Sequence, residues 1–422
     1  MNKNIGIIGL GNVGEAVVES LNRYSALISR RSSLELKIKK VCDISRGKKV
    51  IADKFRLPFT CDPYEIIDDP QIDIIVELIG GIEPARTIIL KALDRRKNVV
   101  TANKALLATS GKHIFSVAQK RKRRVGFEAS VCGAIPLIKS TSEGLVGCEV
   151  SKIYGILNGT TNYILYKMRQ ENIDFSCALK EVQERGLAEK KPDLDIKGID
   201  TLHKLCILTY LYYGLWPDLK AIHTEGISKI SLLDIQYAQE LEYRIKLLAI
   251  AKKGKSSLEL RVHPTLVSVE HPLSHVSLNY NAVYYHTQPA GELLFFGEGA
   301  GGKPTSASII SDIVSIASGN KGFVRNAEKV RLKDFKNVET RFYIRCLALD
   351  SPGVLAEVSK ILASYDISIA SVNQKERKEG KFVPIVMLSH KVKEDNMEKA
   401  LKKIDSLKVI KRPSQIIRIE DL

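Results

Sequence analysis

The sequence predicts an α/β protein with three folded parts. Strand-like apolar runs alternate with helix-like segments over residues 1–125, and the first of these strands runs into a glycine-rich turn. Both features are typical of a Rossmann-type, doubly wound parallel sheet. Residues 340–422 show the order β-α-β-β-α-β, which is typical of a ferredoxin-like unit. Between these parts, residues 126–318 are expected to form an α+β domain, followed by a linker at 319–339.

The composition is that of an ordinary globular protein. The chain has 422 residues, 44% hydrophobic and 27% charged, which leaves room for two or three domains. Its net charge of +17, from 65 basic and 48 acidic residues, is compatible with nucleic acid, a membrane surface or an anionic small molecule. The one dense basic run, residues 120–124, contains no aromatic side chain and lies near no nucleic-acid motif. We therefore expect a solvated helix end there, and an anionic cofactor as the partner in place of nucleic acid.

The cysteines and the apolar segments predict a cytoplasmic protein. The seven cysteines form no C-x-x-C pair, so neither a disulfide framework nor a structural zinc site is expected. No apolar stretch reaches the length of a membrane span, and the N-terminus enters a strand at once. No membrane partner is therefore expected.

A dinucleotide-binding fingerprint follows the first strand. Residues 4–8 form a short apolar run, and apolar residues at helical spacing begin at Ala16. The turn between them has the pattern G-x-G-x-x-G and consists of Gly9, Leu10, Gly11, Asn12, Val13 and Gly14. In such a turn the first glycine permits the bend, the second lets the backbone approach the pyrophosphate, and the third lets helix and strand pack closely. The turn therefore predicts a nicotinamide or flavin dinucleotide, with its phosphates at the helix N-terminus.

The next strand, residues 36–42, leads to residues that bear on the kind of dinucleotide. Asp43 ends it, where the adenosine ribose is expected, although it lies further from the glycines than the usual ~20 residues. An acid there favours NAD, because it accepts a hydrogen bond from the ribose 2′-hydroxyl. Just beyond it, Arg46, Lys48 and Lys49 could hold the 2′-phosphate of NADP. Both cofactors stay open, and we expect NADP to be used at least as well as NAD.

Two further strands and two helices complete the first domain. The strands are expected at 72–79 and 98–101, and the helices at 84–95 and 106–120. Both strands end in small or polar residues, which would lie at the ligand edge of a doubly wound sheet.

The middle of the chain offers two more segments that follow strands. A strand from Val125 runs into a small-residue turn that ends at Pro136 and exposes backbone groups. Farther on, a strand at 152–157 ends in Asn-Gly-Thr-Thr-Asn at 158–162, with a helix expected from Tyr163. An Asn-Gly pair often forms a type I′ hairpin, but no matching second strand follows. We therefore expect residues 158–162 to form a ligand loop.

The chemistry is expected in the stretch 186–204. Two helix breakers, Pro192 and Gly198, predict a loop before an apolar helix. The charged residues of the stretch that we consider are Glu189, Asp193, Asp195, Asp200 and Lys204. Asp200 and Lys204 are four apart and share one helix face, where a solvated ion pair would contribute about 0.3–0.5 kcal/mol. The other interpretation is a general acid or base, because apolar packing around a lysine stem lowers the pKa of the ammonium.

The last domain is predicted element by element. Strands are expected at 342–349, 368–374, 382–389 and 416–419, and helices from 354 to about 365 and at 396–404. The turn at 350–355 places backbone amides at a helix start, where they suit a carboxylate, while the Asp350 side chain suits an ammonium. A free amino acid carries both groups. The alternative is a domain that only dimerises through a sheet edge.

Taken together, these motifs resemble homoserine dehydrogenase over essentially the whole chain. Six motifs occur in that family's order, at 8–14, 77–81, 102–105, 128–131, 158–163 and 297–301. The resemblance implies NAD(P)-dependent interconversion of L-homoserine and L-aspartate 4-semialdehyde, in the biosynthesis of threonine, methionine and isoleucine. It also implies a catalytic and dimerisation domain at 126–318, in a homodimer or homotetramer.

The resemblance assigns roles to residues by position. The residue that matches Lys204 exchanges a proton with the substrate oxygen, and the one that matches Lys104 lies between nicotinamide and substrate. The acids that match Glu189, Asp195 and Asp200 hold the amino acid and orient the lysine. Further substrate contacts are expected at Asn158, Gly159 and Thr160, and further cofactor contacts at Gly186 and Gly301.

A monovalent cation, expected to be sodium, is also implied. Its ligands would be the backbone carbonyls of Glu128, Val131, Gly133 and Ile135. The chain departs from the family at Cys132, where a glycine is common, and at Lys190-Lys191, which put a second ammonium where a carboxylate is usual. Neither departure removes a residue assigned to catalysis.

The last domain resembles an ACT domain, in which such a turn and a partner strand hold an amino acid at a domain interface. The expected contacts are Asp350, Gly353, Val354 and Asn373, and the implied ligand is the end product threonine. Two rival functions remain. One is an amino-acid sensor without activity, suggested by the two lysines. The other is an ACT-bearing dehydrogenase for a different oxo or hydroxy acid, which the segment 158–162 argues against.

Overall fold

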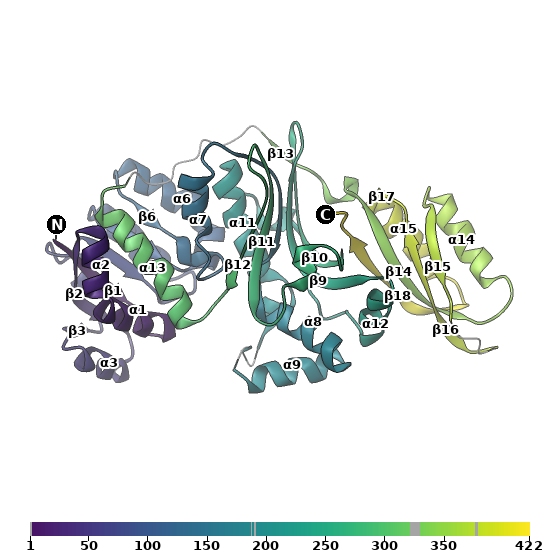
Figure 1. Cartoon of the computed structure of the whole chain (residues 1–422), viewed down its shortest axis with the longest axis horizontal. Coiled ribbons are helices and arrows are strands. Elements are labelled where there is room, and N and C mark those ends of the chain that lie inside the picture. Colours follow the sequence, from purple (N-terminus) through teal and green to yellow (C-terminus); the bar gives the residue numbers. More distant parts are fainter. Residues whose placement is uncertain (1, 187, 190, 321–329, 376–378) are drawn as a thin grey trace. The chain divides into compact units, whose positions relative to one another are not determined.

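The computed structural model describes residues 2–186, 188–189, 191–320, 330–375 and 379–422 (Figure 1). The chain folds as two compact units. Unit 1 contains Met1–Val150, His203–Leu219 and Tyr280–Lys329, and unit 2 contains Ser151–Leu202, Lys220–Asn279 and Val330–Leu422. In the described part of the chain, no helix has the length and apolar character needed to span a bilayer.

Unit 1 contains the predicted Rossmann-type sheet. Six parallel strands lie in the order β3-β2-β1-β4-β5-β6, which is that of a doubly wound sheet. The strands are β1 (Asn2–Ile8), β2 (Glu35–Cys42), β3 (Phe59–Thr60), β4 (Ile74–Glu77), β5 (Asn98–Thr101) and β6 (Val125–Gly126). The helices before residue 150 are α1 (Asn12–Arg23), α2 (Ser25–Ser32), α3 (Lys49–Lys54), α4 (Tyr64–Ile67), α5 (Ala85–Asp94), α6 (Lys104–Lys120) and α7 (Leu137–Lys139).

Helix α13 (Gly302–Ala317) returns to this sheet from late in the chain. Its buried Ile309, Ile313 and Ile316 join the core formed by α1, β1 and β2. A Cβ added at Gly302 would lie 2.8 Å from the carbonyl oxygen of Asn12, at the start of α1. The N-terminus of α13 therefore lies beside the glycine-rich turn, and Figure 1 shows α13 next to α1. A hairpin of β11 (Tyr280–Gln288) and β12 (Gly291–Glu298) precedes it.

Unit 2 is organised around strands in the order β7-β9-β10-β18-β14-β16-β15. Its strands are β7 (Glu149–Ile156), β8 (His223–Thr224), β9 (Tyr243–Lys253), β10 (Ser257–Ser268), β13 (Arg331–Leu332), β14 (Glu339–Leu349), β15 (Ile369–Asn373), β16 (Phe382–Ser389), β17 (Val392–Lys393) and β18 (Ile410–Ile419). Its helices are α8 (Gly159–Glu171), α9 (Phe175–Glu184), α10 (Asp193–Ile196), α12 (Leu232–Glu240), α14 (Val354–Ser364) and α15 (Glu394–Ile404), and α11 (Ile199–Tyr213) starts there and continues into unit 1.

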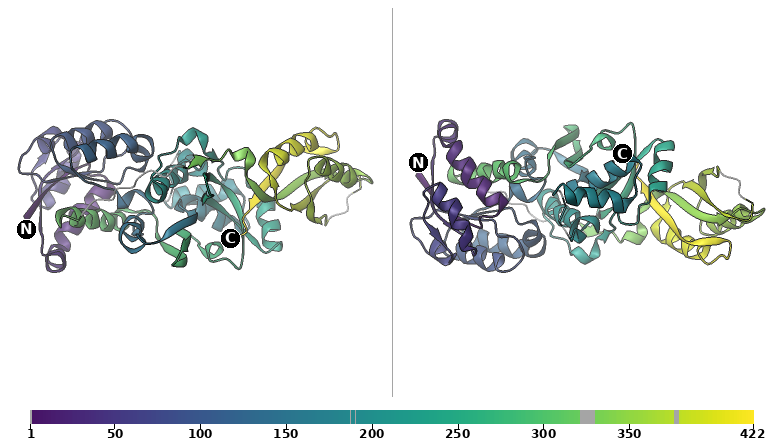
Figure 2. Two further views of the ribbon diagram at one scale, coloured as in Figure 1. Left: turned by 90° about the horizontal axis from the view of Figure 1, so that it is seen from above. Right: turned by 90° about the horizontal axis from the view of Figure 1, so that it is seen from below.

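The predicted ferredoxin-like unit is present at the end of the chain. Strands β18-β14-β16-β15 form its sheet, and α14 and α15 cover one face (Figure 2). Strand β14 alternates as the pleat requires, with Phe342 and Ile344 under these helices. On the opposite face, Tyr343 and Arg345 bond to Asp234 of α12, with an Arg345 Nε to Asp234 Oδ1 distance of 2.7 Å.

This domain shares its sheet with the rest of unit 2. Strand β18 pairs with β14 on one side and, in parallel, with β10 on the other, where Arg418 lies opposite Thr265. Glu420, just after β18, receives a hydrogen bond of 2.5 Å from Nη2 of Arg261, whose side chain is fully buried. The guanidinium and the carboxylate neutralise each other inside the fold.

Two local predictions were wrong in detail, and a third segment contains a short strand that was not predicted. Helix α8 begins at Gly159, so residues 159–162 form its first turn and not a loop before Tyr163. The stretch before α11 contains the short helix α10. The segment predicted as a linker contains β13, which pairs with β10. In each case a tertiary contact or a helix cap decides a conformation that the local apolar pattern leaves open.

The basic run at 120–124 is solvated only in part. Helix α6 ends at Lys120, and this residue is exposed together with the next two. Arg124 is half-buried and donates from Nη1 to the carbonyl oxygen of Ser315 at 2.9 Å.

Candidate active site

The glycine-rich turn has the geometry of a dinucleotide site. Gly9 has a φ of +102°, and a Cβ there would lie 2.6 Å from the carbonyl carbon of Leu78. A Cβ at Gly14 would lie 2.0 Å from the Gly9 carbonyl oxygen, so this glycine is needed for the close contact of helix and strand. At Gly11, in contrast, a Cβ would meet no atom within 4 Å. The backbone at Gly11 is thus open to a ligand, as expected of the second glycine in this motif.

Asp43 supports this turn from the end of β2. Its Oδ2 accepts a hydrogen bond of 2.7 Å from the Leu10 amide, and its Oδ1 accepts one of 2.9 Å from the Ser45 amide. Each oxygen keeps a second lone pair for a ribose hydroxyl. Arg46 and Lys49 nearby are exposed, so they are accessible to a 2′-phosphate.

Lys104 begins α6 at the carboxyl end of β5. The preceding Asn103 caps the helix, accepting from the Leu106 amide at 3.1 Å, and its Nδ2 donates to the Gly81 carbonyl at 2.6 Å. Thr101, at the end of β5, donates a hydrogen bond from Oγ1 to Oε2 of the buried Glu77 at 2.7 Å. Burial raises the pKa of Glu77 above its ordinary value, although several hydrogen bonds act in the opposite direction.

Glu77 and Asn103 lie in the motifs at 77–81 and 102–105 but were not among the predicted site residues. A carboxylate at the end of an apolar strand, and an asparagine directly before a helix, were the available signals. Together they connect the carboxyl ends of β4 and β5 and fix the backbone from which Lys104 projects.

Asn158 brings two of the predicted acids together. Its side chain is 5% exposed, and its Oδ1 caps α8 by accepting from the Thr161 amide at 2.8 Å. Its Nδ2 donates to Oδ1 of Asp195 at 2.7 Å and to Oδ2 of Asp200 at 2.9 Å. The predicted ligand segment is therefore the first turn of a helix whose cap holds two carboxylates. Gly159 is needed here, because an added Cβ would lie 2.6 Å from the Asn279 carbonyl oxygen.

Asp200 and Lys204 are both buried, at 5% and 6% exposure. They lie four residues apart in α11, on one face of the helix. Burial excludes the solvated surface pair for these two residues. Asp193, in contrast, is exposed and forms a solvated ion pair with Lys197, with an Nζ to Oδ1 distance of 2.8 Å.

Two predicted residues are not joined to this cluster. Glu189 is exposed, and among the described residues its carboxylate makes no hydrogen bond or ion pair; its carbonyl accepts from Gln183 at 3.0 Å. Gly186 has a φ of +70° and ends the segment after α9. Lys190, one of the two departures from the family pattern, lies outside the described residues.

The predicted cation turn is strongly bent. Cys132 and Gly133 have φ values of +56° and +50°, so the position of Cys132 is one that favours glycine. A Cβ at Gly133 would lie 2.7 Å from the Gly299 carbonyl oxygen. The Gly133 carbonyl accepts from Ser308 at 2.7 Å, and the Ile135 carbonyl accepts from the Leu137 amide at 2.8 Å. Each of these oxygens keeps one lone pair that a cation could use.

A buried carboxylate pair lies under this turn. Glu128 accepts from the amides of Ile138 and Lys139 at 2.8 and 2.9 Å, and its own amide donates to Asp312 at 2.8 Å. Burial and the neighbouring Asp312 raise the pKa of Glu128 to about 7. Burial raises the pKa of Asp312 to about 6. Among the described residues, no group of three or more His, Cys, Asp or Glu side chains could hold a metal ion.

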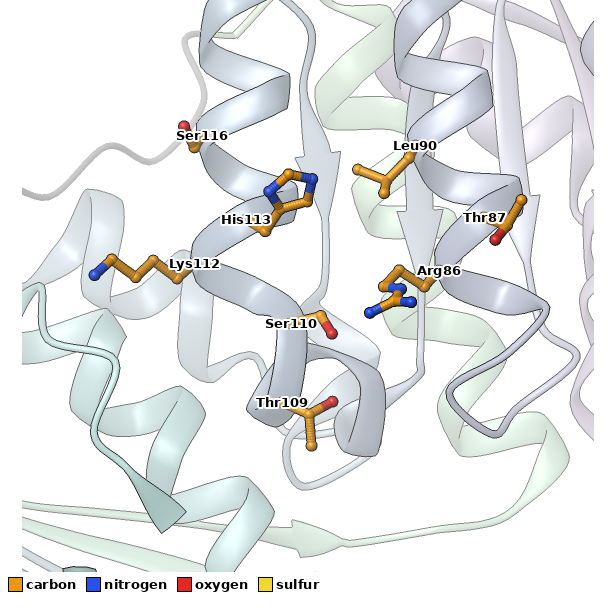
Figure 3. Close-up of a pocket in the computed structure, with 8 residues that line it drawn as sticks. All are labelled: Arg86, Thr87, Leu90, Thr109, Ser110, Lys112, His113 and Ser116. Carbon is orange, nitrogen blue, oxygen red and sulfur yellow. The ribbon is translucent and has the colours of Figure 1, made fainter.

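A surface groove of about 800 Å³ lies between α5 and α6 (Figure 3). Figure 3 shows Leu90 and His113 facing each other across it, whereas Lys112 points away from α5. It is lined by Arg86, Thr87, Leu90, Thr109, Ser110, Lys112, His113 and Ser116. None of these is a predicted site residue, so the groove shares no lining residue with the predicted site.

Known proteins match this chain along its whole length. Family models match as "Homoserine dehydrogenase, NAD binding domain" at 9–128, "Homoserine dehydrogenase" at 136–314 and "ACT domain" at 342–409. Homoserine dehydrogenases of Helicobacter pylori and Neisseria gonorrhoeae are 41% and 37% identical, each over 99% of both chains. A solved homoserine dehydrogenase of Thiobacillus denitrificans has a TM-score of 0.94 at 38% identity and covers 100% of this chain and 99% of its own. A hyperthermophilic archaeal homoserine dehydrogenase in complex with NADPH has a TM-score of 0.66 at 26% identity, and covers 76% of this chain and 99% of its own.

The Rossmann-type sheet with its open Gly11, and the buried Asp200 and Lys204 of α11, define an NAD(P)-dependent oxidoreductase that carries an ACT domain. Relatives that are 37–41% identical over 99% of both chains identify the family within this class. The chain belongs to the homoserine dehydrogenase family.

Proposed function

We propose that this enzyme interconverts L-homoserine and L-aspartate 4-semialdehyde, in the biosynthesis of threonine, methionine and isoleucine in the cytoplasm. When bound, the nicotinamide would accept the hydride that leaves the hydroxyl-bearing carbon in the oxidation, and the hydroxyl would give its proton to a base. An aldehyde and a reduced cofactor result. In the reverse reaction the aldehyde receives one hydride and one proton, so that atoms and electrons balance in each direction.

The chain's own residues supply the proton transfer and the charges. Lys204 takes the hydroxyl proton in the oxidation and returns it to the forming alkoxide in the reduction. Asp200, four residues before it, orients Lys204, while Asp195 and Glu189 hold the substrate ammonium. Lys104 places a positive charge beside the reacting oxygen. Of the predicted substrate contacts, Gly159 and Thr160 complete the first turn of α8.

The observation that carries this proposal is the pair of hydrogen bonds from Asn158 to Asp195 and to Asp200, whose helix α11 also contains the buried Lys204. Such a cluster of acids held by a helix cap suits an amino-acid substrate. The test is the absorbance at 340 nm during incubation with homoserine and each nicotinamide cofactor. If neither cofactor is reduced in the presence of sodium or potassium, the proposal fails.

Lys204→Met tests the assigned proton transfer. A positioned acid or base contributes about 10²- to 10⁴-fold in rate, so kcat should fall by that factor while dinucleotide affinity is retained. Equal losses of turnover and of dinucleotide binding would make Lys204 a structural residue. The sensor without activity is the rival that a negative assay would favour, and the intact Lys104, Asp200 and Lys204 argue against it.

NADP is proposed as a cofactor used at least as well as NAD. The exposed cations after β2 support this preference, whereas Asp43 favours NAD. Replacement of Arg46, Lys48 and Lys49 with glutamine should shift the ratio of kcat/KM values toward NAD. An unchanged ratio would mean that the three cations are only solvated surface. Gly186 and Gly301 are proposed as further cofactor contacts; Gly301, with a φ of +120°, caps α13.

A sodium ion is proposed at the backbone carbonyls of Glu128, Val131, Gly133 and Ile135. The bent turn with its two positive φ values supports this placement. Activity measured in tetramethylammonium buffer with added sodium or potassium tests it, and activity independent of both would contradict it. A homodimer or homotetramer is the proposed assembly, and light scattering measures it.

The ACT domain is proposed to bind threonine as the feedback inhibitor. Gly353, with a φ of +90°, is the N-cap residue of α14, and Asp350 lies half-buried three residues before it. Val354 and Asn373 complete the proposed contacts. Asp350→Asn should weaken inhibition by threonine, because the ammonium group of the bound threonine loses its counter-ion. Asp366→Asn changes an exposed acid of the same domain and serves as the control. Equal inhibition of both variants would leave the domain with an assembly role only.

The proposed domain boundaries are 1–125, 126–318 and 340–422, with a linker between the last two. Truncation after residue 338 does not test regulation in this protein. It would remove β18 from the sheet and leave the buried Arg261 without Glu420. Point variants of the full chain are therefore the appropriate test.

A further inference from the structure

A buried guanidinium connects the C-terminal strand with the region of the substrate acids. Arg418 of β18 is 4% exposed and donates from Nε and Nη2 to the carboxylate of Glu394 at 2.5 and 3.1 Å. Its Nη1 donates to Oε2 of Glu225 at 2.7 Å. Burial would raise the pKa of Glu225, but the hydrogen bond with His223 and the charge of Arg418 lower it to about 2. Glu225 is therefore ionised at every ordinary pH.

Glu225 begins a short backbone segment that packs against the turn between α10 and α11. The amide of Ile227 donates to the Ile196 carbonyl at 2.9 Å. At Gly226, an added Cβ would lie 1.9 Å from that same oxygen, so only glycine permits this approach. A Cβ at Gly198 would lie 3.4 Å from the Glu225 carbonyl oxygen. The backbone of 225–227 thus contacts both ends of the turn.

That turn carries the two carboxylates that Asn158 holds. Asp195 lies in α10, just before the turn, and Asp200 lies in the first turn of α11, just after it. Their hydrogen bonds to one Nδ2 atom, at 2.7 and 2.9 Å, fix the spacing of the two acids. A displacement of the turn changes this spacing directly.

We propose that Arg418 and Glu225 are positioning residues for the substrate site. The last strand of the ACT domain supplies the guanidinium, Glu225 is held by it, and the backbone after Glu225 holds the turn that spaces Asp195 and Asp200. Because Glu394 of α15 binds the same guanidinium, the ACT domain and the substrate acids share one rigid connection. This inference rests on the proposed function, which makes the two acids substrate contacts.

Two conservative variants test the connection. Arg418→Lys keeps the charge but cannot bridge two carboxylates with a planar fork, and Glu225→Gln keeps the side chain's size. A displacement of ~1 Å can cost roughly 10²-fold in rate, so kcat/KM for homoserine should fall about 10- to 100-fold, mainly through KM. Affinity for the dinucleotide, measured by fluorescence, should be unchanged, because its turn lies in unit 1.

A matched control separates positioning from stability. Glu420 follows the same strand, is also 4% exposed and pairs with Arg261 at 2.5 Å. Glu420→Gln should lower the thermal midpoint without raising KM for homoserine. The KM effects of Arg418→Lys and Glu225→Gln should not add in the double variant, since both act through one contact. The loss of thermal stability caused by Glu420→Gln should add to that of either variant, and KM should not rise further.

The outcomes distinguish this inference from the proposed function. An unchanged KM in both variants, or an equal rise of KM in Glu420→Gln, would overturn the positioning role. A wild-type enzyme without homoserine-dependent reduction would instead overturn the proposed function. If Arg418→Lys does not fold, Glu225→Gln decides alone, because Arg418 keeps Glu394 as its partner in that variant.

Discussion

Asn158→Asp is the substitution that examines the candidate site most directly. It keeps an oxygen that can accept from the Thr161 amide, so the cap of α8 is retained, but it removes the donors to Asp195 and Asp200. Hydrogen bonds to charged groups contribute about 1.5–3 kcal/mol each, which gives about 3–6 kcal/mol for the two. If that spacing is needed in the transition state, kcat/KM for homoserine should fall by about 10²- to 10⁴-fold at 1.36 kcal/mol per tenfold.

The assay is the initial rate of cofactor reduction at 340 nm, with circular dichroism and dinucleotide binding as checks on the fold. Asn172→Asp makes the same chemical change at the exposed C-cap of the same helix and should leave the rate unchanged. Three neighbouring carboxylates cannot all ionise easily, and one that is protonated regains a donor. The variant should therefore improve relative to wild type as the pH falls. A kcat/KM for Asn158→Asp equal to that of wild type would refute the reasoning.

The remaining predictions concern the dinucleotide turn and one buried lysine. Gly11→Ala should weaken dinucleotide binding without changing the thermal midpoint, because its Cβ enters open space, whereas Gly14→Ala should destabilise the fold by about 1–3 kcal/mol through overpacking. Thermal melts and titrations with NADPH separate the two, and equal effects would contradict the assigned roles. Lys246 has its pKa lowered from 10.5 to about 7 by burial and by the charges of Arg169 and Arg244. Its pKa is lower in the folded state than in the unfolded state, so between these two values the unfolded state binds the extra proton. The unfolding free energy of wild type should therefore fall by about 1.4 kcal/mol per pH unit as the pH falls toward 7, whereas that of Lys246→Met should lack this dependence. Urea unfolding at several pH values between 7 and 10 measures this, and a pH-independent difference between the two proteins would contradict it.

The sequence predicted most elements because their apolar periods are strong. The strand expected at 98–101 and the one at 382–389 have those bounds in the structure. The start of α8 was placed four residues late, because Asn158, Gly159 and Thr160 are poor interior helix residues, and a cap was the signal to use. Local patterns thus give an element's type more reliably than its first residue.

The site was predictable only in its chemistry. Asp195, Asp200 and Asn158 were each selected as candidates, but their meeting at one Nδ2 atom depends on a contact between residues about forty positions apart. The role of Glu225 and Arg418 was not predictable, since a glutamate and an arginine almost two hundred residues apart carry no local signal of pairing.

The position of β18 has a consequence for the order in which the protein is made. Its partner β10 is synthesised some 150 residues earlier, and β14, its other partner, also precedes it. As the chain emerges from the ribosome, the Rossmann strands β1 to β6 can pair at once, whereas unit 2 must wait with an incomplete sheet and with Arg261 lacking Glu420. We expect nascent chains arrested before residue 410 to resist proteolysis in the N-terminal domain and to be digested in unit 2, and protection of unit 2 should appear only when β18 has left the exit tunnel.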